Sequence, residues 1–211
     1  MKISRRYSFK SLLSLISYIS LFKVSFGNSQ ILAGKDVVVI GAGISGLVAA
    51  STLIKKGANV IILEAKNYIG GRIRTDRSLG APFEYGAGWI HGPSKDNTIR
   101  NLADSSNSSL FVKDDDSCEL FNISGNDINE KVWEDDVGEV QNILRTSWLN
   151  VPFTKGAYSF PRVDNSEKDF ENLAEPIDNK LFFCGEHTNL KYLATTHGAL
   201  ITGIRAAKEV I

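Results

Sequence analysis

Four residues near the N-terminus have types and a spacing that suit the binding of a dinucleotide. Gly41, Gly43 and Gly46 form a Gly-x-Gly-x-x-Gly pattern. In such a pattern the first glycine permits a tight turn, the second lets the backbone approach a pyrophosphate, and the third lets a helix pack closely on a strand. Glu64 follows 23 positions after Gly41 and can accept hydrogen bonds from both ribose hydroxyls of an adenosine. A carboxylate there also disfavours NADP, because it would face the negative 2′-phosphate.

The elements needed to position these residues are present in the same stretch. Residues 36–40 form a continuous apolar run, which predicts a strand buried on both faces of a parallel sheet. Apolar residues then repeat at three- and four-residue intervals from Ile44 to Ile54, which predicts a helix that Gly57 ends as a left-handed C-cap. Residues 59–64 form a second apolar strand. The pattern predicts an α/β fold, a Rossmann-like domain with a parallel sheet and flanking helices, whose helix start faces the pyrophosphate.

The residues after Glu64 resemble the flavin amine oxidase family. Residues 67–75 read Asn-Tyr-Ile-Gly-Gly-Arg-Ile-Arg-Thr, and residues 83–92 read Phe-Glu-Tyr-Gly-Ala-Gly-Trp-Ile-His-Gly. The second segment is closest to the polyamine oxidase branch of the family. The resemblance implies FAD as cofactor, with Arg72 near its pyrophosphate as a fixed, charged donor. It also implies that His91 faces an amine substrate, whose hydrogen bond a neutral imidazole can accept.

The C-terminal third is similar to the same family. By this resemblance Trp148 packs near the flavin ring, and Tyr158 forms one wall of an amine pocket, where its ring attracts a cation. Residues 181–184 are predicted to be a last buried strand, which leads into Gly185 and into Glu186, expected on the ribityl chain. A helix after Thr195 is expected to direct its positive N-terminus at the flavin, where negative charge gathers on reduction. Thr195 occupies the second pocket wall, which is therefore not aromatic here.

Two sets of site residues follow from the motifs and the resemblance. The candidate catalytic residues, which face the substrate, are His91, Tyr158 and Thr195. The candidate FAD-binding residues are Gly41, Gly43, Ile44, Ser45, Gly46, Glu64, Ala65, Gly71, Arg72, Gly88, Trp89, Ile90, Trp148, Gly185, Glu186, Thr195 and Thr196.

The sequence passes from the family's N-terminal pattern to its C-terminal pattern within a short junction. We expect a targeting segment at 1–30, the two halves of an incomplete FAD-binding domain at 31–127 and 142–211, and a junction at 128–141 where the substrate domain is absent. The absent part would carry the family's lysine near flavin N5, and no lysine here stands in that context. A complementing chain could supply the missing domain, and uncovered apolar surface is expected without it.

The first 30 residues are predicted to direct export. Basic residues precede a short apolar stretch at 11–22, which is too short for the roughly 20 residues that span a bilayer and is typical of a secretory signal. Arg5 and Arg6 also lie in a twin-arginine-like context. A periplasmic or secreted protein, with no stable membrane span once the signal is removed, is therefore expected; an uncleaved anchor or an unstructured tail is the alternative.

Composition narrows the remaining classes of function. Lys+Arg and Asp+Glu both number 24, so no basic surface favours nucleic acid. Cys118 and Cys184 lack a CxxC spacing, and Cys184 is predicted to be a buried strand residue. Three histidines without close ligand spacing predict no metal site. The leading hypothesis is FAD-dependent oxidation of a polyamine-like amine. The alternatives are a non-catalytic remnant that binds FAD weakly or not at all, and another FAD oxidoreductase of the same fold.

Overall fold

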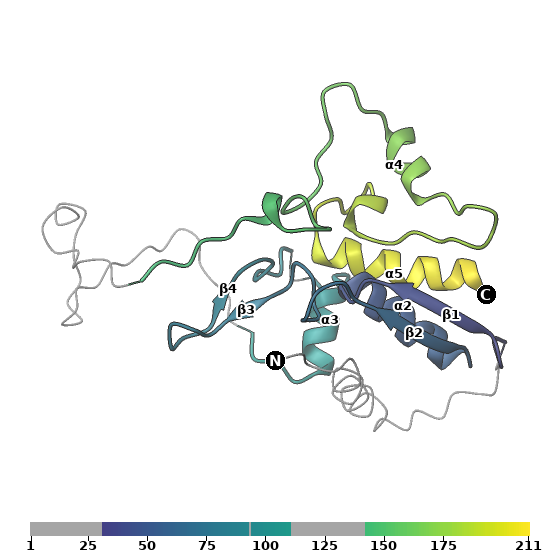
Figure 1. Ribbon diagram of the computed structural model, residues 1–211, viewed down its shortest axis with the longest axis horizontal. Coiled ribbons are helices and arrows are strands. Elements are labelled where there is room, and N and C mark those ends of the chain that lie inside the picture. The colour runs from purple at the N-terminus through teal and green to yellow at the C-terminus, as the bar shows by residue number, and fades with distance from the viewer. Residues whose placement is uncertain (1–30, 93, 111–141) are drawn as a thin grey trace, which may run out of the picture. The chain divides into compact units, whose positions relative to one another are not determined.

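The computed structural model describes residues 31–92, 94–110 and 142–211, all of which belong to one compact unit, Ile31–Ile211 (Figure 1). The predicted targeting segment at 1–30 and the predicted junction at 128–141 lie outside the described residues. Cys118 also lies outside them. Across the described ranges, no helix is both long enough and apolar enough to cross a membrane.

A βαβ unit forms from the dinucleotide-binding motif. Strands β1 (Asp36–Ile40) and β2 (Asn59–Leu63) pair in parallel and in register along their whole lengths. Helix α2 (Ile44–Lys55) connects them. Gly57 follows its end, with a left-handed φ of +94° and an N–H that donates to the carbonyl of Ile54. The predicted strands, helix and C-cap are therefore confirmed, and this small parallel sheet with helices is consistent with part of the predicted α/β domain.

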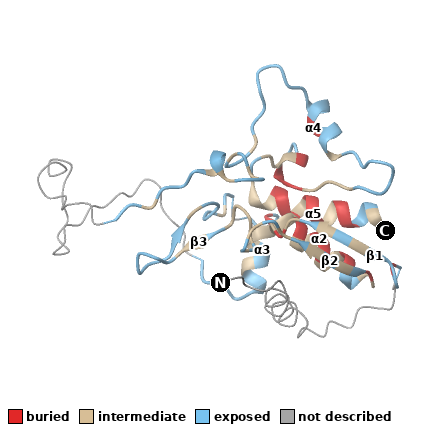
Figure 2. Cartoon of the chain, viewed as in Figure 1, coloured by how far each residue is buried: buried red, intermediate tan, exposed pale blue. Residues whose placement is uncertain are grey.

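The core lies where α2 packs against the C-terminal helix. α5 (Thr196–Val210) contacts α2, which also contacts both strands, and Figure 2 shows buried residues along both helices. Alanines on each helix keep the two backbones close. The buried residues of this core cluster are Leu32, Ala49, Leu53, Ala58 and Ala207, with the partly buried Val37, Val39, Val60 and Val210 packed around them.

The parallel sheet is covered on one face only, so the prediction of burial on both faces is wrong. Side chains alternate between the two faces of a strand; those that point toward α2 are partly buried, and the others lie in solvent. Ile40 is 80% exposed and Leu63 is 53% exposed, with Val38 and Ile61 beside them. Within the described residues, β1 and β2 form a sheet of two strands, and no described element is packed on the outer face.

The predicted strand at 181–184 is also wrong. The range contains only one isolated antiparallel bridge, because side chains of α5 satisfy the backbone here in place of a neighbouring strand. Arg205 donates to the carbonyl of Phe183 at 2.7 Å, and the Thr202 hydroxyl accepts from the N–H of Gly185 at 3.0 Å. The segment therefore runs extended beside α5 and delivers Glu186 to the helix's N-terminal end. Cys184, which belongs to this segment, is half-buried outside any strand, and burial raises the pKa of its thiol.

Shorter elements complete the described chain. The shorter elements are the antiparallel pair β3 (Thr75–Asp76) and β4 (Phe83–Glu84), helices α3 (Thr98–Ser105) and α4 (Glu167–Ala174), and the 3₁₀ turns η2 (Trp148–Asn150) and η3 (Glu186–Thr188).

Candidate functional site

Two glycine loops lie against each other at the carboxyl end of β1. Gly43 and Gly70 form a parallel bridge, and the N–H of Gly70 donates to the carbonyl of Ala42 at 2.8 Å. A Cβ added at Gly71 would lie 3.4 Å from the Cα of Gly43. A larger side chain at Gly71 would therefore push the two loops apart. The Gly-Gly pair thereby brings Arg72 beside the dinucleotide loop.

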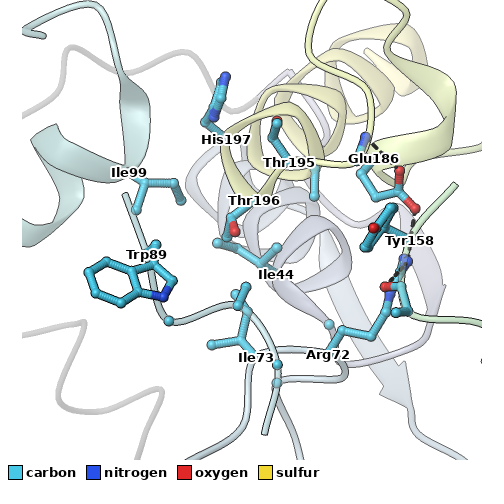
Figure 3. Close-up of a pocket in the computed structure, with 18 of the residues that line it drawn as sticks. Ile44, Arg72, Ile73, Trp89, Ile99, Tyr158, Glu186, Thr195, Thr196 and His197 are labelled. Atoms are coloured by element: carbon cyan, nitrogen blue, oxygen red, sulfur yellow. Dashed lines mark hydrogen bonds and ion pairs between the residues drawn. The ribbon is translucent and has the colours of Figure 1, made fainter. Parts of the chain in front are cut away.

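A pocket of about 530 Å³ opens at this junction, within the usual range for small-molecule sites. In Figure 3 the start of α5 faces Ile44 at the start of α2, with Trp89 and Tyr158 on opposite sides. The predicted residues that line the pocket are Gly43, Ile44, Ser45, Arg72, Gly88, Trp89, Ile90, His91, Trp148, Tyr158, Glu186, Thr195 and Thr196.

The other predicted FAD contacts lie outside the pocket lining: Gly41, Gly46, Glu64, Ala65, Gly71 and Gly185. Gly46 has a packing role, since a Cβ there would lie 2.1 Å from the carbonyl oxygen of Gly41. Glu64 supports the loop, because its carboxylate accepts from the N–H of Ala42 at 2.7 Å and from the N–H of Lys66 at 2.9 Å.

Two helices direct their N-termini into the pocket. α2 has Gly43 at its N-cap without a side-chain cap, so its first backbone N–H groups are available to an anion. α5 is capped by Thr195, whose hydroxyl accepts from the N–H of Gly198 at 3.0 Å and donates to the carbonyl of Tyr192 at 2.7 Å. Thr195 also lines the pocket, where its hydroxyl is already engaged.

An ion pair in the pocket lining joins the N-terminal part of the described chain, up to residue 110, to its C-terminal part at 142–211. Arg72 donates to Glu186 at 2.8 Å and to the carbonyl of Ala157 at 3.1 Å. The Glu186 carboxylate also accepts from the N–H and hydroxyl of Ser159 and from the N–H of Ala194. Burial alone would raise the pKa of Glu186, but the bonds from Ser159, Arg72 and Ala194 outweigh burial and hold that pKa below its ordinary value. Glu186 is therefore ionised in the folded protein at neutral pH.

Glu186→Gln should remove a pH-dependent part of the stability. Because the folded pKa is lowered, the carboxylate stabilises the fold above the ordinary glutamate range, near pH 4.5, and that stabilisation is lost as the pH falls through the folded pKa. We expect the variant to lose about 1–2 kcal/mol at pH 7, as for charge-assisted hydrogen bonds with one partly exposed partner. Urea unfolding from pH 7 to pH 3 measures it, and a wild-type minus variant difference that stays constant with pH would contradict it.

Residues outside the predicted set also join the N-terminal and C-terminal parts of the described chain. The carbonyl of Tyr85 accepts from the indole N–H of the predicted residue Trp148 at 3.0 Å, and Lys66 Nζ donates to the Thr154 hydroxyl at 2.9 Å. Lys66 also lies over the Trp148 ring at 5.9 Å. Within the N-terminal part, Arg74 lies over the Tyr85 ring at 5.1 Å. Tyr85 lies within the motif at 83–92, so its aromatic side chain in that motif could have marked it as a site residue from the sequence.

His197 is the functional candidate missed by sequence reasoning. It lines the pocket one residue after Thr196, and its ring packs edge-on to Tyr192 at 4.6 Å between centroids. Burial, and then the nearby His91, lowers the pKa of His197, so its neutral form is favoured. His91 is exposed at the pocket rim. In the parts of the chain that the structure describes, no group of three metal-ligating side chains occurs.

The chain is similar in sequence to a known protein family and to several of its members. The family model of flavin-containing amine oxidoreductases matches residues 44–129 and 115–211. Probable polyamine oxidase 4 of Arabidopsis thaliana is 43% identical over 103 residues, which cover 44% of this chain and 21% of the relative. Polyamine oxidase 2 of Arabidopsis thaliana is 36% identical over 107 residues, covering 46% of this chain and 22% of the relative.

Solved structures include one of wild-type putrescine oxidase bound to putrescine. It is 27% identical, with 66% of this chain and 25% of that chain covered, and its TM-score of 0.32 is too low to define a shared fold. The chain matches only about a fifth of the length of the curated relatives. The similarity therefore concerns a part of those proteins.

Proposed function

The chain belongs to the family of flavin-containing amine oxidoreductases, and we propose that it forms the FAD site of an enzyme that oxidises polyamine-like amines. The observation that carries the proposal is the pocket itself. The N-termini of α2 and α5, from opposite ends of the sequence, open on one cavity beside the Arg72 guanidinium. The two helix N-termini and the Arg72 guanidinium, whose charge Glu186 balances in part, favour a cofactor with anionic parts.

The residues present fit FAD at the pyrophosphate position. A Cβ at Gly43 would meet no atom within 4 Å, which leaves the backbone of the loop open to a ligand. The first turn of α2 has no acidic residue that would repel a phosphate. Gly43, Ile44 and Ser45 would therefore hold the pyrophosphate through backbone N–H groups, with Arg72 as an additional donor.

Glu64→Ala should weaken FAD binding tenfold or more. Each Glu64 oxygen accepts one backbone hydrogen bond and retains a lone pair for a ribose hydroxyl. A hydrogen bond to a charged acceptor contributes about 1.5–3 kcal/mol, which is about tenfold or more in affinity. Quenching of FAD fluorescence in a titration measures the effect, and the melting temperature of each protein shows whether the loop itself has been lost. An unchanged dissociation constant would remove Glu64 from the ribose site.

The described residues cover the substrate side of the pocket only in part. Bound FAD would supply the acceptor for a hydride from the carbon next to the amine nitrogen. The positive end of α5 would stabilise negative charge at the reduced ring, His91 would accept a hydrogen bond from the neutral amine, and the Tyr158 ring would attract its cationic groups. Trp89 and Tyr158, however, are 61% and 63% exposed.

With polyamines and monoamines alike, the isolated chain should therefore not reduce its bound FAD above the background rate. Productive transfer needs the amine carbon about 3–3.5 Å from the acceptor in a site without bulk water, and the open side of this pocket does not exclude water. Anaerobic mixing of the FAD-loaded chain with spermine, spermidine or a monoamine should leave the flavin band unbleached, and aerobic mixing should give peroxide at background rates. Saturable bleaching by a polyamine would show that these 211 residues form a complete oxidase.

The same openness favours a second candidate, a non-catalytic remnant that binds FAD weakly or not at all. A complementing chain that carries the substrate domain would separate the two candidates, because it should restore bleaching only if the flavin site is intact. Export through the N-terminal segment is part of the proposal, since a twin-arginine route would carry the protein already folded around its cofactor.

A further inference from the structure

Asn97 is a buried polar residue that lines the pocket but has no part in the proposed cofactor contacts. It is 6% exposed. Its Oδ1 accepts from the N–H groups of Ile99 at 2.9 Å and of Arg100 at 3.4 Å, so it is the N-cap of α3. An N-cap requires only an acceptor, and serine or aspartate serves as well as asparagine.

The amide group of the same side chain makes two further bonds. Nδ2 donates to the carbonyl of His91 at 2.9 Å and to that of Gly92 at 3.2 Å. Gly92 has a φ of +63°, so the backbone turns where Asn97 holds it. The side chain therefore uses both N–H donors of its amide. The other common N-cap side chains do not carry two N–H donors and cannot replace these two bonds.

The loop formed by the motif at 83–92 is thereby anchored at its two ends to different elements. At its start, the Trp148 indole bonds the carbonyl of Tyr85, and the N–H of Ala87 donates to the carbonyl of Arg72. At its end, Asn97 joins the loop to α3, which in turn contacts α5. The residues from Gly88 to His91 therefore depend on Asn97 for their position relative to α5.

We propose that Asn97 is a positioning residue, which holds His91 and the preceding Trp89 and Ile90 at the pocket through its two amide donations. The substrate role of His91 rests on the proposed function, but its position does not. The lowered pKa of His197, which has a contribution from His91, is consistent with an imidazole held near the start of α5.

Asn97→Ser in the full chain tests the proposal, because serine keeps the cap and removes both donations. Asn101→Ala is the matched control: Asn101 is an exposed residue of α3 whose amide donates to the Lys95 carbonyl at 2.9 Å. NMR titration of the histidines in the apo protein should show a displaced His91 resonance and a His197 pKa that rises toward its ordinary value. The His187 curve should be unchanged, and Asn101→Ala should match the wild type.

In the FAD-loaded protein, Asn97→Ser should weaken FAD binding about threefold to tenfold, as for one or two lost hydrogen bonds. If the serine variant does not fold, Asn97→Asp keeps the volume and the cap, and its His91 resonance is compared at about pH 9, where imidazoles are neutral. Wild-type histidine curves in a folded Asn97 variant, or an equal shift in Asn101→Ala, would overturn the proposal and leave Asn97 as a cap. Because the histidine measurement needs no cofactor, failure of the wild type to bind FAD would refute the proposed function separately.

Discussion

Gly43→Val should abolish retention of FAD while leaving the protein folded. Gly43 has φ and ψ of −75° and 173°, an extended conformation that valine adopts readily. Its Cβ would meet no protein atom within 4 Å, so the fold itself has room for the side chain. The added methyl groups would instead occupy the pocket next to Ile44 and Ser45, where the backbone must contact the pyrophosphate.

The measurement combines gel filtration with absorbance. Wild-type protein incubated with FAD should leave the column yellow, whereas Gly43→Val should be colourless and should melt within a few degrees of the wild-type apo protein. Gly43→Ala provides the graded control, because a single methyl group should weaken binding without preventing it. A yellow Gly43→Val protein would place the cofactor elsewhere, and a variant that unfolds would show that the loop is structural.

Gly203→Val should strongly destabilise the packing of α5 against α2. Gly203 lies where α5 crosses α2, and a Cβ there would lie 2.3 Å from the carbonyl oxygen of Ser45. That atom belongs to the backbone of α2, so the two helices would have to separate. Overpacking of this kind costs typically 1–3 kcal/mol, and we expect the upper end, about 3 kcal/mol, because valine is also a poor helix former.

Denaturant unfolding measures this loss, with Gly156→Val as the matched control. A Cβ at Gly156 meets nothing within 4 Å, and the same substitution there should change the stability by less than about 0.5 kcal/mol. FAD affinity should fall as well in Gly203→Val, because Ser45 lies in the first turn of α2 that faces the pocket. Equal stability of the two variants would show that the helices adjust without cost.

The local elements were predictable because their causes lie close together in the sequence. The glycines at 41, 43 and 46, the apolar runs on either side and the C-cap at Gly57 each act within a few residues, and β1, α2 and β2 formed where these signals stand. The family was also predictable, since motifs at both ends of the chain carry it. Local propensity and motif chemistry need no knowledge of what packs against them.

Only the tertiary structure decided which partners these elements and side chains have. An apolar run cannot report whether both faces of its strand are covered, and Ile40 is exposed because α2 covers one face alone. The run at 181–184 reads as a strand, but α5 supplies its contacts: Arg205 bonds the carbonyl of Phe183, and Thr202 bonds the N–H of Gly185, which follows the run. Likewise Arg72 and Glu186, 114 positions apart, bond each other in the pocket. Pairing over such separations depends on packing that no local pattern encodes, because the partner's distance in space is set by the whole fold.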